Sequence, residues 1–391
     1  MCKFVSLTLF TDYADPIYTR LAKLSQHQIQ DDPDLKRYLF QQGVTFVCDG
    51  QPSRFTDVWT AQLERTKSLS SSENIVEMLA REEVYQRIHG ENSQPLSKTT
   101  LGGNSQWNKA YCNLENSFID AKACIQIYYD RCLKLPSIKF RCGSAVDNII
   151  VVEDKSRGVT MESGSTIVAD LVVVAAGAWS NKLVYLGNRV YPIGHEVAWI
   201  KVTPEEEARW KNMSITTNMS TGLNMFPPYH GEIKILRRSP GYKNTTTVPH
   251  PEDRSKTLEI SYPGTIVSNP TDVIPAEAEA AMRENLREIM PTLANRPFDR
   301  TKICWWVTLS YTSRFCKSIN FWIKLQDQHY PHSRLSDRSS SSYFRYSSCH
   351  RRLCACMEVS THHWGSRRRF DRRISTSRIG GKVGISKVLR G

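Results

Sequence analysis

Hydrophobic and polar positions divide the first three quarters of the chain into stretches with helical spacing and stretches with strand-like spacing. Apolar residues recur at roughly helical intervals within residues 11–42 and again within residues 56–89. Residues 118–129 read as an amphipathic helix, and residues 276–289 as a helix that ends before Pro291. The pattern therefore predicts four helical stretches, separated by shorter apolar runs.

The strand-like runs are short, and several of them are interrupted by proline. We predict strands at residues 42–47 and 138–142, a meander over 148–168, and further strands at 194–202, 222–227, 232–236 and 256–262. Strands with isolated helices among them are typical of an antiparallel sheet, which we expect for the second half of this region.

A mostly β-branched apolar run at Leu171–Val174 is followed by four small residues, 175–178, and then by Trp179. Such a run is typical of a strand that is buried on both faces. Small residues at its end let a ligand or a neighbouring backbone come close. The residues alone leave two interpretations open: a strand end that contacts a cofactor, or a tightly packed strand end without a ligand.

Residues 172–179 resemble the late flavin-contacting strand of the sarcosine oxidase-like FAD-dependent amine oxidases. This family includes sarcosine, pipecolate and saccharopine oxidases and the fructosyl amino acid oxidases, or amadoriases. Further resemblances follow the family's order, at residues 12–18, 221–228, 233–235, 240–242 and 300–305. The resemblance implies an enzyme that uses FAD to oxidise the C–N bond of a secondary amine or N-substituted amino acid, with O2 giving H2O2.

The fold class that this resemblance implies is α/β (α+β). We expect an incomplete FAD-binding Rossmann-like domain from residues 1–40 and 105–188. An antiparallel β-sheet substrate domain would come from residues 41–104 and 189–306. Residues 307–391 form a Ser/Arg-rich tail, which we expect to be disordered because it carries too few periodic apolar residues to build a core.

Cofactor-binding residues are implied by the same resemblance. Val146 would take the place of a turn that contacts adenine, and Ala176, Gly177 and Trp179 lie in the flavin-contacting segment. Cys304 aligns with the cysteine that joins the flavin covalently through a thioether, so FAD is expected as a cofactor that Cys304 can tether. From its local sequence alone, Cys304 also fits a buried structural thiol.

Lys234 occupies the place of a family lysine that lies over the flavin and assists the reduction of dioxygen. A fixed cation there stabilises the negative charge that develops; the alternative is a solvated lysine on an edge strand. Four residues further on, Arg238 stands where amadoriases carry glutamate and sarcosine oxidases histidine, which argues against fructosyl-amine specificity. Its guanidinium either pairs with a substrate carboxylate or points to solvent.

Two family segments are missing from the sequence. The Gly-x-Gly-x-x-Gly turn that holds the FAD pyrophosphate at a helix N-terminus is absent, and the first glycine is Gly43. After Trp306 there is no Gly-His-Gly-Phe-Lys segment. We therefore expect a family member that is truncated at its N-terminus, altered at its C-terminus and impaired in holding FAD. The alternative function is that of a catalytically inactive remnant.

Charge is concentrated at the end of the chain. Residues 307–391 hold 17 Lys and Arg against 4 Asp and Glu, and the remaining residues hold 35 of each kind. The tail fits a nucleic-acid-binding segment less well than a shifted reading frame or retained intron, because its arginine run lacks interleaved aromatic residues. The expected partners are a small amine substrate and O2, with no membrane and no nucleic acid.

Cysteine usage and the chain ends bear on the compartment. Eleven cysteines without a repeated spacing fit reduced thiols, so we expect a cytoplasmic monomer. A peroxisomal location, known in the family, is not indicated by the terminal residues 389–391. We expect no metal site: the tail set does not match a zinc pattern, and the neighbours His195 and Glu196 read as structural. That tail set is His350, Cys354, Cys356, His362 and His363.

Overall fold

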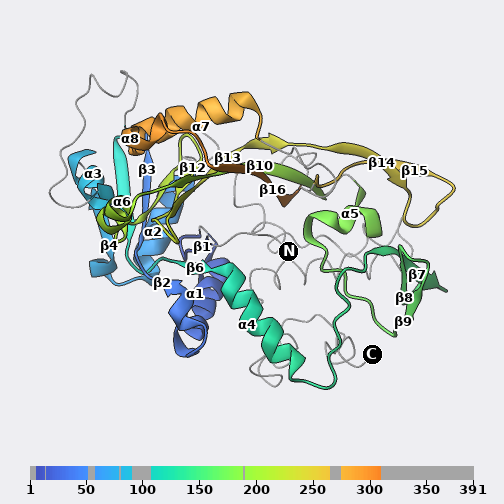
Figure 1. Ribbon diagram of the computed structural model, residues 1–391. Helices are drawn as coiled ribbons and strands as arrows, with labels where there is room; N and C mark the ends of the chain where they lie inside the picture. The colour runs from blue at the N-terminus through green and yellow to red at the C-terminus, as the bar shows by residue number, and fades with distance from the viewer. Residues whose placement is uncertain are drawn as a thin grey trace.

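The computed structural model describes residues 6–13, 15–51, 58–78, 81–89, 107–187, 190–264 and 274–309. Figure 1 shows its elements. The helices are α1 (Pro16–Asp31), α2 (Trp59–Leu69), α3 (Arg81–His89), α4 (Ala121–Leu133), α5 (Ser180–Leu183), α6 (Pro204–Trp210), α7 (Ala276–Ile289) and α8 (Pro291–Ala294). Short 3-10 helices are η1 (Lys36–Tyr38), η3 (Ser72–Asn74) and η4 (Gly177–Trp179).

Within these described ranges, the largest element is an eight-stranded sheet with the order β16-β10-β13-β12-β11-β3-β5-β4. All of its pairs are antiparallel except β11 with β3, which is parallel. Most of the strands predicted before residue 138 and after residue 168 are confirmed here. The strands are β3 (Val44–Cys48), β4 (Ile75–Met78), β5 (Lys109–Asn113), β10 (Val190–Lys201), β11 (Ile215–Asn218), β12 (Leu223–Met225), β13 (Glu232–Tyr242) and β16 (Arg300–Leu309).

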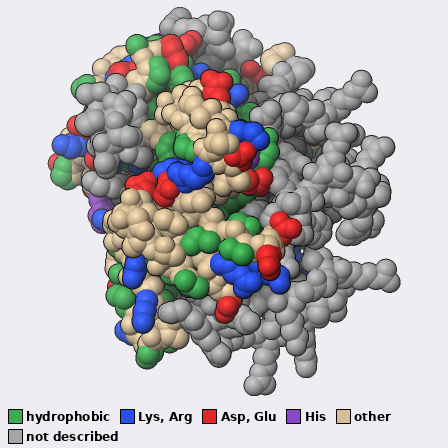
Figure 2. Space-filling model, turned by 90° about the vertical axis from the view of Figure 1, so that its right-hand side faces the viewer, with side chains coloured by type: hydrophobic (Ala, Val, Ile, Leu, Met, Phe, Trp, Pro, Cys, Tyr) green, Lys and Arg blue, Asp and Glu red, His purple; other side chains and the backbone are tan. Residues whose placement is uncertain are grey.

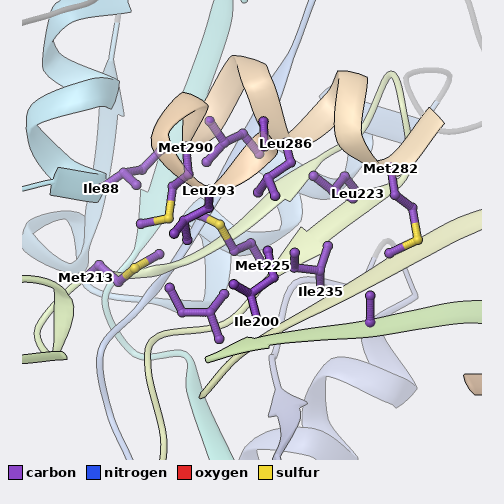
Figure 3. Packing of buried hydrophobic residues seen from close by; sticks show 14 of the residues in the cluster. Ile88, Ile200, Met213, Leu223, Met225, Ile235, Met282, Leu286, Met290 and Leu293 are labelled. Atoms are coloured by element: carbon purple, nitrogen blue, oxygen red, sulfur yellow. The ribbon is translucent and has the colours of Figure 1, made fainter. Parts of the chain in front are cut away.

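One face of this sheet packs against α7 and α8, and this contact forms the main hydrophobic core (Figure 3). In α7, Met282 and Leu286 recur at helical spacing and are completely buried against strand residues such as Met225 and Ile235. The predicted helix at 276–289 is therefore confirmed with its bounds. Burial of a side chain of this size contributes roughly 1.5–3 kcal/mol, so this layer fixes the sheet from one side.

The opposite face of the sheet carries a second layer. It contains the three-stranded sheet β1-β6-β2, made of β1 (Ser6–Leu9), β6 (Ser117–Asp120) and β2 (Leu39–Phe40), together with α1 and α4. Asp15 caps α1, and Asp120 caps α4, each accepting backbone N–H groups of the first turn. The helix predicted over 11–42 is shorter than expected because Asp32 and Pro33 end it.

A third group of strands lies beside α5. The sheet β7-β8-β9 contains β7 (Val146–Val152), β8 (Lys155–Met161) and β9 (Thr166–Val168), which confirms the predicted meander. The hairpin of β14 (Thr245–Pro249) and β15 (Thr257–Ser261) extends from the large sheet toward this group (Figure 1). Its Arg254 pairs with Asp147 at 2.8 Å.

Several local predictions are wrong. Residues 171–176 form no strand, and Val172, Val173 and Val174 are only half-buried. An extended segment becomes a strand only where a neighbour supplies hydrogen bonds, and the described residues place none beside it. Residues 75–78 were predicted within a helix, but they form a strand because β5 supplies hydrogen-bond partners for them. Residues 138–142 carry no regular structure.

The described surface mixes charge signs. Figure 2 shows hydrophobic, basic and acidic side chains in small interspersed groups, in keeping with the equal numbers of acidic and basic residues before position 307. None of the described helices is long and apolar enough to cross a membrane. The predicted tail begins at residue 307, but residues 307–309 form the end of β16. The rest of this prediction falls on residues 310–391, which lie outside the described part of the chain.

Candidate active site

The side chains of chemical interest gather on the face of the large sheet opposite α7, which we call the Lys234 face. In the strand register, Trp199 lies opposite Lys234, and His195 lies opposite Cys304. Residues paired across neighbouring strands point to the same side of a sheet. Lys234 and Cys304 therefore share a face, with β10 between their strands.

A buried apolar cluster on the Lys234 face, which we call the apolar floor, lies beside Lys234 and includes Cys304. Val197, Trp199, Leu236 and Cys304 form one buried cluster on the Lys234 face. From the register, Lys234 and Cys304 are about 10 Å apart across two strand spacings and about 13 Å apart along the strands. The two residues thus border one surface without touching.

Lys234 is buried, with 4% of its surface exposed. Its ammonium group lies 4.5 Å from the centre of the Phe226 ring and donates a hydrogen bond to the Ser6 carbonyl oxygen of β1. A lysine held by a ring face and a backbone carbonyl is fixed in place. The alternative of a solvated lysine on an edge strand does not hold, because β13 lies inside the sheet.

Cys304 is also buried and has no disulfide partner. The η4 turn packs against β10 and against β16, the strand that carries Cys304. Gly177 opens this turn with φ of +53°, a conformation that favours glycine. Trp179 closes it with 39% of its surface exposed. The structure therefore brings Ala176, Gly177 and Trp179 close to the strand of Cys304.

Val146 lies elsewhere. It begins β7, pairs with Met161 and is half-buried, away from the Lys234 face. The predicted site residues thus divide into one group on or beside the large sheet and one residue on the β7–β9 sheet.

A pocket opens on the Lys234 face beside Lys234's own strand, with Arg238 of β13 at its border. The other lining residues are Thr8, Phe10, Asp12, Tyr13, Val44, Phe46, Val58, Gln62, Thr217, Met219 and Asn224. Burial lowers the pKa of the Arg238 guanidinium, while the nearby Tyr13 raises it. Arg238 therefore lines a pocket from which water is largely excluded.

Asp12 lines this pocket and is held by a network of hydrogen bonds. It is buried, and its carboxylate accepts hydrogen bonds from Thr66 at 3.0 Å, Tyr111 at 3.3 Å and Asn113 at 3.1 and 3.2 Å, and from Asn116. Burial raises the pKa of Asp12, against these hydrogen bonds, which lower it. The network ties the segment 10–13 to α2 and β5.

Asp12, Gln62 and Asn224 are pocket residues that the sequence pattern did not identify as site residues. Asp12 opens the motif at residues 12–18, so its position was visible but its burial was not. Gln62 comes from α2, 49 residues before its partner Tyr111, and no local pattern links the two.

Comparisons with known proteins agree with this architecture. The model of the family described as FAD dependent oxidoreductase matches residues 10–312. The chain is 28% identical over 307 residues to L-saccharopine oxidase of Schizosaccharomyces pombe, covering 75% of this chain and 67% of the relative.

Two solved structures illustrate the shared fold. A modified fructosyl peptide oxidase from Aspergillus nidulans superposes with a TM-score of 0.67 at 20% identity, over 78% of this chain and 70% of its own. Fructosamine oxidase (Amadoriase II) from Aspergillus fumigatus superposes with a TM-score of 0.63 at 22% identity, over 78% and 67%.

Proposed function

The chain belongs to the family of FAD-dependent oxidoreductases, and on that premise we propose that it oxidises the C–N bond of an amine. The substrate would be a secondary amine or N-substituted amino acid of the sarcosine, pipecolate, saccharopine or fructosyl amino acid type, with O2 giving H2O2. The observation that carries this proposal is the fixed cation of Lys234 on the same sheet face as the pocket bordered by Arg238.

The residues of the Lys234 face fit the ring system of FAD. They offer an apolar floor, a buried cation at one side and the Cys304 thiol at the other. The N-termini of α1 and α4 fit the pyrophosphate less well, since carboxylates already occupy them. The first turn of α7 is acidic as well.

When bound, FAD accepts two electrons from the amine and delivers them to dioxygen. Lys234 would hold positive charge where negative charge develops on the reduced ring and on oxygen. Arg238 would bind the substrate carboxylate at the pocket border. The Asp12 network would keep segment 10–13 closed over the pocket and so exclude water. Cys304, beside η4, would supply the thiol for a covalent link, and Val146 would contact adenine.

The rest of the proposal concerns organisation. The substrate domain would consist of residues 41–104 and 189–306, because seven of the eight strands of the large sheet come from these ranges; the eighth, β5, falls in the range expected for the FAD-binding domain. A cytoplasmic monomer fits the free thiols of the described cysteines, which are Cys48, Cys112, Cys124, Cys132, Cys142 and Cys304. The alternative of an inactive remnant receives no support from the comparisons.

The test is to purify the full chain with FAD supplied, to measure bound flavin by its visible absorption, and to assay peroxide with four substrates. These are sarcosine, pipecolate, saccharopine and a fructosyl amino acid. We expect flavin binding and peroxide production with at least one of them. Bound flavin without peroxide from any secondary amine would overturn the proposal, as would a complete failure to bind flavin.

A further inference from the structure

Gln62 presents a hydrogen-bond acceptor to the pocket. Its side chain is 7% exposed, and its amide NH2 group donates to the Tyr111 hydroxyl at 2.8 Å. The same hydroxyl donates its hydrogen to the Asp12 carboxylate at 3.3 Å. A hydroxyl has one hydrogen, so Tyr111 can only accept from Gln62.

These two hydrogen bonds determine the orientation of the Gln62 side-chain amide. The NH2 group must face Tyr111, and the carbonyl oxygen then faces away from it, where Gln62 lines the pocket. This oxygen makes no hydrogen bond to a described residue. Asn224, by contrast, is satisfied inside the protein: its oxygen accepts from Thr217 at 2.9 Å and its NH2 group donates to the Gly222 carbonyl at 3.0 Å.

Gln62 and Arg238 both line the pocket and come from different elements, α2 and β13. Arg238 is on β13, whereas the partner of Gln62, Tyr111, is on β5, four positions away in the sheet order. Neighbouring strands are about 4.8 Å apart, so the strands of Arg238 and Tyr111 are roughly 19 Å apart. Arg238 supplies a cation to the pocket lining, and Gln62 supplies an acceptor next to Tyr111 and the buried Asp12 carboxylate.

We propose that Gln62 is a specificity-determining residue that selects substrates whose side arm ends in a hydrogen-bond donor. With the substrate carboxylate at Arg238, the arm reaches the amide oxygen of Gln62. A hydroxyl or ammonium group donates to that oxygen. A carboxylate there meets an acceptor and the negative charge of Asp12, and is rejected. This inference rests on the proposed oxidation and names the substrate class for the same pocket.

The experiment compares kcat and KM for N-substituted amino acids that differ only in the end of the arm: hydroxyl, ammonium or carboxylate. Sarcosine, which has no arm, reports whether the oxidation itself occurs. In the unmodified protein we expect both donor arms to exceed the carboxylate arm in kcat/KM by about tenfold or more. Peroxide from sarcosine with equal kcat/KM for all three arms would overturn the selectivity while leaving the proposed function standing.

Three variants locate the effect. Gln62→Met should raise KM for donor arms about tenfold and shrink the selectivity ratio. Gln62→Glu should favour the ammonium arm over the hydroxyl arm. Tyr111→Phe frees the amide to turn its NH2 group into the pocket, so the carboxylate arm should gain. Gln126→Met, on the exposed side of α4, is the matched control.

Binding supplies a second readout. Calorimetry with the unreactive N-acetyl forms of the three amino acids should give the same order of affinities. If Gln62→Met and Tyr111→Phe, both folded by circular dichroism, leave the ratio of the three arms unchanged in turnover and in binding, the inference is wrong.

Discussion

Lys234 is the side chain on which the proposed chemistry depends most. Replacing it by methionine keeps the length of the side chain and removes the charge. We expect Lys234→Met to slow the reaction of reduced flavin with O2 by about 100-fold, the size of effect found when one preorganised electrostatic partner is lost. Reduction of the flavin by the amine should change much less.

Rapid-mixing measurements of the two half-reactions check this expectation. Lys122→Met, at an exposed position of α4, serves as the control. If both half-reactions slow equally, Lys234 acts by holding β1 through the Ser6 carbonyl and not through its charge.

Asp32 gives a prediction for pH. Arg131 binds it with two hydrogen bonds of 2.5 and 2.8 Å, and these lower the pKa of Asp32 from 3.8 to about 2. A carboxyl whose pKa is lower in the folded state stabilises that state above its unfolded pKa of 3.8. This stability is lost as pH falls through about 2.

Arg131→Ala should therefore lower the free energy of unfolding by about 1 kcal/mol at neutral pH, since the pair is partly exposed and solvent screens it. Near pH 2 the difference between the two proteins should vanish. Urea unfolding at pH 7, 4 and 2 measures it, and a difference that stays constant across this range would contradict the assignment.

At the scale of residues, the sequence identified the candidate site residues that lie in family-like motifs. It did not identify residues whose roles come from contacts between distant parts of the chain. Lys234, Arg238 and Cys304 were named from the sequence; the register shows that Lys234 and Cys304 share a face, and Arg238 lines the pocket on that face. Gln62 and Tyr111 were not named, because their roles come from a hydrogen bond between separate elements. Such long-range pairs leave no local spacing to read.

The strands show a similar limit of prediction from the sequence. Residues 194–202 and 171–174 are both predicted as strands, yet only the first stretch forms one. β10 lies between β13 and β16 and pairs with both, whereas residues 171–176 have no described neighbour to pair with. Hydrophobicity predicts a tendency to extend, but pairing decides the outcome.

A pair of matched substitutions tests this difference. Val197 is completely buried in β10, so Val197→Asp places an unpaired carboxylate in the core and costs several kcal/mol. We expect it to prevent folding. Val173 is half-buried outside any strand, so Val173→Asp should be tolerated with a smaller loss of thermal stability. Circular dichroism on the two purified variants distinguishes them, and equal losses would show that residues 171–176 are held as tightly as β10.

Among the described residues, the large sheet and the β7–β9 sheet have very unequal hydrophobic cores. The large sheet and α7 bury an extensive hydrophobic cluster, whereas the β7–β9 sheet buries Ile149 and Met161 and leaves Val151, Val152 and Val168 exposed. Sequence patterns predicted both sets of strands. They could not show how the β14–β15 hairpin would reach from one to the other, because that contact joins residues more than 100 positions apart.

Unequal cores predict unequal stability within the chain. Local opening costs less free energy where fewer apolar side chains are buried, so amides in β7 and β8 should exchange with solvent faster than amides in β10 and β13. The Arg254–Asp147 pair links the β14–β15 hairpin region to β7, and the tilted rings of Tyr185 and His250, with centres 4.7 Å apart, link it to the chain after α5. Arg254→Ala should therefore speed exchange in β7 and β8 by a few fold, since the pair is exposed and worth less than about 1 kcal/mol. It should leave exchange in β10 and β13 unchanged.

Hydrogen exchange followed by mass spectrometry on peptides from the four strands measures both effects. If all four strands exchange at one rate, and respond together to Arg254→Ala, the chain opens as a single cooperative unit and the hairpin is part of its common core.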